Sequence, residues 1–284
     1  MTRLPAVNRK YELQNILSTL VLTVAALIFV LPIYISFIGA FKTDEDIIRY
    51  PLALPVNGTF ENIKYVLTDP SGNILRMYLN TLIIVSAALT VTLLVSSMAG
   101  FYTSRGKTKV SRFLYVYFIF GLMIPYQIAF LGVVQILKRV HLIGTFPGII
   151  LVFISGNIMF SVFMYNGFIK SIPGELEEAA SIDGAGQMRL FWQIIFPLVK
   201  PCTATTAIFA GLSMWNDFFT PLIVLGGGKL ATVTSGIYTS ISLYNSAWGH
   251  VFAYVLFASL PIIIIYIFAQ NAIISGLTAG AIKG

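Results

Sequence analysis

Charge is scarce in this sequence. Only 10% of the 284 residues are Asp, Glu, Lys or Arg, whereas 57% are hydrophobic. Ordinary soluble domains have roughly a quarter of their residues charged. A soluble fold of this length could not hide so much apolar surface, because too few charged side chains are present to cover it. The composition therefore favours a protein that spans a membrane.

Side chains that carry chemistry are also few. Cys202 is the only cysteine, so it forms no internal disulfide, and it is expected to be a small buried hydrophobic residue. His141 and His250 flank apolar segments and Asp217 stands alone within one, so no cluster for metal binding or acid–base catalysis is expected. The sequence Gly-Gly-Gly-Lys at 226–229 lacks the spacing and the following Ser or Thr of a phosphate-binding loop. We expect no metal, no bound nucleotide and no enzymatic activity in this chain.

Long stretches without charge dominate the sequence. About 20 uncharged, mostly apolar residues are enough for a helix to cross the roughly 30 Å hydrocarbon core of a membrane. These stretches are apolar on every face and longer than barrel strands need, which favours helices over a β-barrel. We predict an all-α integral membrane protein with a single transmembrane domain over residues 1–284. The expected spans are approximately 14–41, 77–103, 113–136, 145–168, 201–225 and 251–275.

The first span and the basic residues predict the topology. The apolar run that opens the chain is longer than that of a signal peptide, so we expect it to remain in the mature protein. With the N-terminus in the cytoplasm, 11 of the 18 Lys and Arg residues lie on the cytoplasmic side, which favours an N-in and C-in topology. The basic residues interrupt apolar runs instead of gathering on one soluble face. The net charge of +7 is therefore not taken as a sign of nucleic-acid binding.

The loop over residues 170–200 differs from the other loops in being long and acidic at its start. Ser171 is expected to cap a helix over 171–184 that has three carboxylates in its first turns, and Gly184 is expected to end it. Its residues Leu176, Ala179, Ala180 and Asp183 are expected to share one side. A second amphipathic helix at the membrane interface is predicted from Met188, Phe191, Trp192 and Ile195. The pattern allows either an element that receives a push from a soluble partner or an inert amphipathic loop.

Polar residues within the apolar runs are candidates for a solute path. Pro125 interrupts the third expected span and is predicted to kink it, either to line a path or only to pack. Asp217 could contact a polar solute, or it could fix helix packing or an outer gate. The candidate path residues are Asn80, Gln127, Asn157, Asn216 and Asp217.

Four segments carry a family resemblance. The sequence Glu-Ala-Ala-Ser-Ile-Asp-Gly at 178–184, followed after nine residues by Ile-Ile-Phe-Pro at 194–197, resembles the coupling motif of ABC importer permeases, and only Phe196 departs from it. Segments 51–55 and 215–222 resemble the carbohydrate-uptake subfamily that includes the maltose importer. The tail at 276–284 is similar to that of the shorter of its two permease subunits.

The resemblance implies the type I ABC importer permease fold and a multi-pass protein of the bacterial plasma (inner) membrane. It implies one permease subunit of a binding-protein-dependent, ATP-driven sugar or oligosaccharide importer. The implied partners are a second, related permease subunit in a heterodimer, two nucleotide-binding ATPase subunits, an extracytoplasmic sugar-binding protein and membrane lipid. ATP and Mg would be bound by the ATPase subunits. The alternative is an ion-coupled secondary carrier of a small polar solute, which is disfavoured because the spans hold at most one carboxylate.

The resemblance also assigns roles to residues of this chain. The short helix around Glu178 would dock in a cleft of the ATPase subunit, Glu178 would contact a basic residue there, and Gly184 would permit the turn. The implied coupling residues are Glu178, Ala179, Ala180, Asp183, Gly184, Ile194 and Pro197. The cytoplasmic tail would reach the ATPase dimer interface through Thr278, Gly280 and Lys283.

Overall fold

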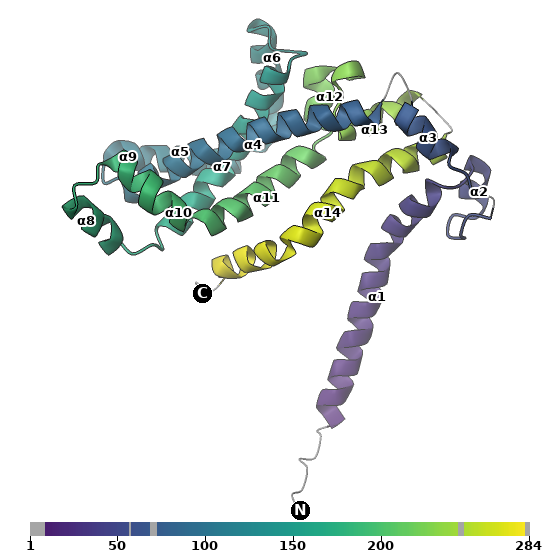
Figure 1. The fold of residues 1–284 in the computed structure, drawn as a ribbon, viewed down its shortest axis with the longest axis horizontal. Coiled ribbons are helices and arrows are strands. Elements are labelled where there is room, and N and C mark those ends of the chain that lie inside the picture. The colour runs from purple at the N-terminus through teal and green to yellow at the C-terminus, as the bar shows by residue number, and fades with distance from the viewer. Residues whose placement is uncertain (1–8, 57, 69–72, 244–246, 282–284) are drawn as a thin grey trace, which may run out of the picture. The chain divides into compact units, whose positions relative to one another are not determined.

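The computed structural model describes residues 9–56, 58–68, 73–243 and 247–281 (Figure 1). Within these residues every regular element is a helix, which confirms the all-α prediction. The α-helices are α1 (Arg9–Gly39), α2 (Asp44–Arg49), α3 (Glu61–Thr68), α4 (Ile74–Arg105), α5 (Lys109–Met123), α6 (Tyr126–Arg139), α7 (Phe146–Ile169), α8 (Glu175–Ile182), α9 (Gln187–Leu190), α10 (Phe196–Leu198), α11 (Lys200–Asn216), α12 (Phe219–Leu225), α13 (Val233–Leu243) and α14 (Trp248–Ala281). A π-helix, η1 (Phe191–Ile195), and a 3-10 turn, η2 (Gly228–Leu230), complete the set.

Four of these helices, α1, α4, α7 and α14, contain segments long and apolar enough to cross a membrane. Two further helix pairs pass the same test only if each bent pair is counted as one span. The pairs are Lys109–Met123 with Tyr126–Arg139, bent by 105°, and Gln187–Leu198 with Lys200–Asn216, bent by 74°. By length and composition the described chain thus has four to six spans. The six-span count and the orientation remain predictions.

The expected third and fifth spans are both interrupted. The third divides at Ile124 and Pro125, where the proline lacks the amide hydrogen that would continue the helix. The bend of 105° is a break and not the slight kink that a proline often produces. The segment predicted as the fifth span divides at Asp217, which has extended backbone angles between α11 and α12.

The chain forms two compact units, and the first contains residues 1–69 and 243–257. Its connecting segment is held by buried polar side chains. The Nζ of Lys42 donates to the carbonyl of Tyr50 at 2.8 Å, and the Nδ2 of Asn62 donates to the carbonyls of Ala40 and Lys42 at 3.1 and 2.8 Å. The most apolar 18-residue stretch of α1 has no residue buried within the described chain.

The second unit contains residues 70–242 and 258–284, and its centre is the pair α4 and α7. Figure 1 shows these two helices running side by side. Gly100 of α4 allows the close approach, because a Cβ at this position would lie 2.5 Å from the Cβ of Tyr165. The amide of Asn166 donates to the Oγ1 of Thr103 at 2.9 Å, which adds a buried hydrogen bond between the helices. The pair is a rigid base for the loop that follows α7.

Candidate functional site

The first helix of the 170–200 loop is α8, and it begins later than predicted. Gly174 stands at its N-terminus and no side chain caps it. The predicted cap by Ser171 is wrong, because the Oγ of Ser171 donates to the carbonyl of Phe168 at the end of α7 instead. Pro173 separates this turn from α8. A proline disfavours helical backbone angles at the residue before it, here Ile172. Carboxylates in the first turn complement the helix dipole without a cap.

The C-terminal end of α8 agrees with the prediction. Asp183 is the C-cap, and Gly184 adopts a left-handed backbone conformation with φ of 77°. Nothing lies within 4 Å of the place where a Cβ would stand on Gly184, so the backbone angle and not the space demands glycine. A residue with a side chain would cost about 1–2 kcal/mol in this conformation.

The sides of α8 have different surroundings. Ala180 is buried and packs in a cluster formed with α4, α7, the 187–199 segment and α11. Glu178 is exposed, and of Leu176, Ala179, Ala180 and Asp183, which were expected to share one side, only Ala180 is buried. Ile182 is 86% exposed, although it is a large apolar residue. The exposure of Ile182 was not predicted, although its position four residues after Glu178 places both side chains on one side of the helix. The outward face of α8 is defined here as Glu178, Ala179 and Ile182.

An ion pair fixes the inner side of α8. The Nε of Arg105 lies 2.6 Å from the Oε1 of Glu177, and the side chains are 25% and 16% exposed. The Nη2 of the same guanidinium donates to the carbonyl of Ile172 at 2.7 Å. Because Arg105 is the last residue of α4, this contact joins α8 to a long apolar helix. No sequence signal pointed to it, since Arg105 and Glu177 are 72 residues apart.

The second part of the loop is a continuous helix over Gln187–Leu198, as predicted, and it contains a π-helical stretch. It consists of α9, the π-helix η1 and α10. Phe191, Ile195 and Leu190 are buried within the protein, whereas Met188 and Trp192 of the predicted apolar stripe are exposed. In a π-helix the hydrogen bonds join residues five apart in the sequence instead of four. The 3.6-residue period used for the prediction therefore does not apply across η1. Of the remaining motif residues, Ile194 is half-buried, whereas Pro197 is exposed in α10.

The candidate path residues do not form one cluster. Asn80 is buried, and its Nδ2 donates to the carbonyls of Lys229 and Ala231 at 3.0 and 2.9 Å. It therefore ties the segment around η2 to α4. The Nδ2 of Asn157 donates to the carbonyl of Phe153 in its own helix. Gln127 and Asn216 are exposed in the isolated chain.

Asp217 holds the break between α11 and α12. Its Oδ1 accepts a hydrogen bond from the amide of Thr220 at 3.0 Å, and its carbonyl accepts one from the Oγ1 of Thr234 at 2.9 Å. The hydroxyl of Tyr126, the first residue of α6, lies 3.5 Å from the Oγ1 of Thr220. The rings of Phe130 and Phe219 lie 5.2 Å apart. The break at Pro125 and the break at Asp217 are therefore in contact.

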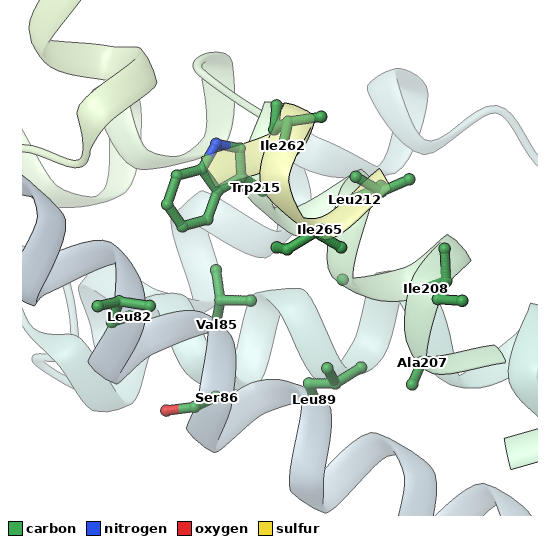
Figure 2. Close-up of a pocket in the computed structure, with 11 residues that line it drawn as sticks. Leu82, Val85, Ser86, Leu89, Ala207, Ile208, Leu212, Trp215, Ile262 and Ile265 are labelled. Carbon is green, nitrogen blue, oxygen red and sulfur yellow. The ribbon is translucent and has the colours of Figure 1, made fainter. Parts of the chain in front are cut away.

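A cavity of about 310 Å³ lies between α4, α11 and α14 (Figure 2). Its labelled lining includes Leu82, Leu89, Ile208, Ile262 and Trp215, and Ser86 contributes a hydroxyl. None of the five candidate path residues lines it. An almost entirely apolar wall cannot replace the hydrogen bonds that a polar solute makes with water. This cavity is therefore unsuited to a polar solute.

The tail residues lie partly outside the described structure. Thr278 and Gly280 belong to the last turns of α14, which continues to Ala281. Lys283 lies outside the described residues. Among the described residues, no group of three or more His, Cys, Asp or Glu side chains could hold a metal ion.

The chain matches one protein family and is similar to known transport permeases. Residues 92–276 match the family described as binding-protein-dependent transport system inner membrane component. The chain is 31% identical to the probable starch degradation products transport system permease protein AmyC of Thermoanaerobacterium thermosulfurigenes, over 97% of this chain and 99% of that protein. It is 29% identical to the arabinooligosaccharides transport system permease protein AraQ of Bacillus subtilis, over 97% and 98% of the two chains.

The fold is also similar to that of a solved structure. A chain of a bacterial ABC transporter involved in the import of the acidic polysaccharide alginate matches with a TM-score of 0.78 and 21% sequence identity. The match covers 94% of this chain and 99% of that one. The matched family segment contains α5 to α13, both helix breaks and the whole 170–200 loop.

Proposed function

The chain belongs to the binding-protein-dependent transport system inner membrane components, and we propose that it forms part of the translocation path of an ATP-driven carbohydrate importer. As a member of that family it is a multi-pass inner-membrane permease and not an enzyme, and ATP is hydrolysed by a separate subunit. The observation that carries the proposal is the full-length match to carbohydrate permeases.

The solute class follows from the relatives. AmyC is named for starch degradation products, AraQ for arabinooligosaccharides, and the similar solved transporter for alginate import. All three names refer to carbohydrates or to products of carbohydrate degradation. We therefore assign to this chain an oligosaccharide or sugar, delivered by an extracytoplasmic binding protein.

The proposed contact with the ATPase is the outward face of α8. Glu178, Ala179 and Ile182 are exposed while Ala180 anchors the helix on the permease. A short helix that presents one acidic, one small and one large apolar side chain fits a groove with a basic rim, which is a common mode of helix recognition. Asp183 and Gly184 end this helix, and Ile194 and Pro197 lie in the segment that leads into α11. The ATPase subunits would bind ATP and Mg.

The other proposed contacts involve the rest of the chain. A second permease is expected to cover part of the apolar surface, including α1. We expect the solute path to lie next to the contact between the two helix breaks. Gln127 lies near the break at Pro125, and Asn216 and Asp217 lie at the break between α11 and α12. Asn80 and Asn157 would support this region by holding backbone. The tail residues Thr278, Gly280 and Lys283 are proposed to contact the ATPase dimer.

The test is uptake by the complete importer in proteoliposomes, with the second permease, the ATPase subunits and the binding protein present. A labelled maltooligosaccharide and a labelled arabinooligosaccharide serve as solutes. We expect uptake to require ATP on the ATPase side and to persist when an ionophore collapses ion gradients. Uptake that follows an imposed proton gradient in vesicles without the ATPase subunits would instead support the ion-coupled carrier.

A further inference from the structure

The guanidinium of Arg105 joins three segments of the permease. Its Nε contacts the carboxylate of Glu177 in α8 at 2.6 Å, and its Nη2 donates to the carbonyl of Ile172 between α7 and α8 at 2.7 Å. Arg105 itself ends α4. Figure 1 shows α8 at the end of the second unit. Arginine suits this place because its planar fork makes hydrogen bonds in two fixed directions at once.

The surroundings of Arg105 make α4 a rigid support. Two residues before Arg105, Thr103 accepts the hydrogen bond from Asn166 of α7, and five residues before it Gly100 lies against Tyr165. The ion pair is largely screened from solvent, with side-chain exposures of 25% and 16%. Charge-assisted hydrogen bonds with this degree of burial are stronger than those of exposed pairs.

Within the part of the chain that the structure describes, few other contacts hold α8. Ala180 is its buried residue, and an alanine offers little surface to resist tilting. The backbone links on either side, 171–174 and 183–186, are turns or irregular segments. Without the Arg105 contacts, α8 would keep its packing through Ala180 but lose its polar connection to α4.

We propose that Arg105 is a positioning residue that makes α8 and the adjacent end of α4 move as one rigid body, so that a displacement of α8 is transmitted to α4. This inference rests on the proposed docking of α8 on the ATPase. In this role the ion pair acts through α8 and α4 and requires no contact with the solute or ATP. It determines whether movement at the outward face of α8 reaches an apolar helix or is lost as tilting of α8 alone.

The test combines a distance with a transport ratio in the complete importer. Spin labels are placed at Val95→Cys of α4 and Ser181→Cys of α8, both exposed positions, after the buried Cys202 is replaced by Ala. We expect the same narrow distance distribution without nucleotide and in the ATP-trapped complex. In Arg105→Gln the distribution is expected to broaden. Uptake per ATP hydrolysed is expected to fall about tenfold or more, because the loss of one charge-assisted hydrogen bond changes an equilibrium by about this factor.

Two variants separate this role from simple stabilisation. Lys107→Gln removes an exposed positive charge two residues away and is expected to change neither the distance nor the ratio. Arg105→Lys retains the charge opposite Glu177 but loses the second hydrogen bond, to the carbonyl of Ile172. We therefore expect uptake per ATP hydrolysed to lie between the values for the wild type and Arg105→Gln. If Arg105→Gln fails to assemble, Arg105→Lys carries the test.

A distribution that stays narrow in the substituted importer would overturn the proposal, and so would a wild-type distance that changes on ATP trapping. These outcomes do not depend on uptake. A wild-type importer without ATP-dependent uptake would overturn the proposed function instead. The two failures are therefore distinguishable.

Discussion

Replacing Glu178 with Arg and Ile182 with Asp in one variant is expected to reduce ATP-driven uptake about a hundredfold or more. Both residues are exposed on the outward face of α8. The variant reverses the charge and removes the apolar contact offered to the ATPase, and two central interface residues commonly account for about 2 kcal/mol each. Exposed substitutions usually change folding stability by less than about 0.5 kcal/mol. The amount of permease in the membrane should therefore stay the same.

This prediction is measured as initial uptake rate in proteoliposomes with equal amounts of assembled permease. The matched control introduces the same residue types at exposed positions outside α8, as Gln187→Arg with Lys107→Asp. The control is expected to retain uptake. Equal uptake by both variants would show that the outward face of α8 does not contact the ATPase.

Gly100→Ala is expected to destabilise the permease itself. The new Cβ would lie 2.5 Å from the Cβ of Tyr165 and 3.2 Å from the backbone nitrogen of Asn166, so α4 and α7 would have to move apart. Overpacking of this kind costs about 1–3 kcal/mol. Separation of the two helices would also weaken the hydrogen bond between Thr103 and Asn166.

The measurement for Gly100→Ala is thermal unfolding of the purified permease in detergent, together with its level in the membrane. Gly167→Ala is the matched control, because Gly167 is an exposed residue of α7 with nothing within 4 Å of a new Cβ. Alanine should be neutral or stabilising there, by up to about 1 kcal/mol from helix propensity. If Gly100→Ala unfolds at the same temperature as this control, the close contact between α4 and α7 is wrong.

Local chemistry explains which parts of α8 could be predicted from the sequence. The end of the helix at Asp183 and Gly184 depends on a backbone conformation that glycine favours, so one residue type was enough. The start was missed because Ser171 had an alternative acceptor in α7. The burial of Ala180 depends on which other segments pack against α8, and the spacing of residues within α8 contains no such information.

Long-range pairing explains most of the other differences. Arg105 and Glu177 have ordinary sequence surroundings, and only the fold brings them together. Asn80 and Asp217 were recognised as unusual because they are polar within apolar runs, but the sequence could not distinguish a solute contact from a backbone tie. Pro125 predicted an interruption correctly, whereas the size of the bend depends on the neighbours of α6.

Docking of α8 on the ATPase is tested most directly by photo-crosslinking from position 182 in the fully assembled importer. A benzoylphenylalanine at this exposed position is photolysed, and the crosslinked partner is identified by mass spectrometry. The same residue at position 117, an exposed site of α5, is the control. If α8 docks on the ATPase, position 182 crosslinks to the nucleotide-binding subunit and position 117 does not. Crosslinks from position 182 only to lipid or to the other permease, in an importer that still takes up solute, would contradict it.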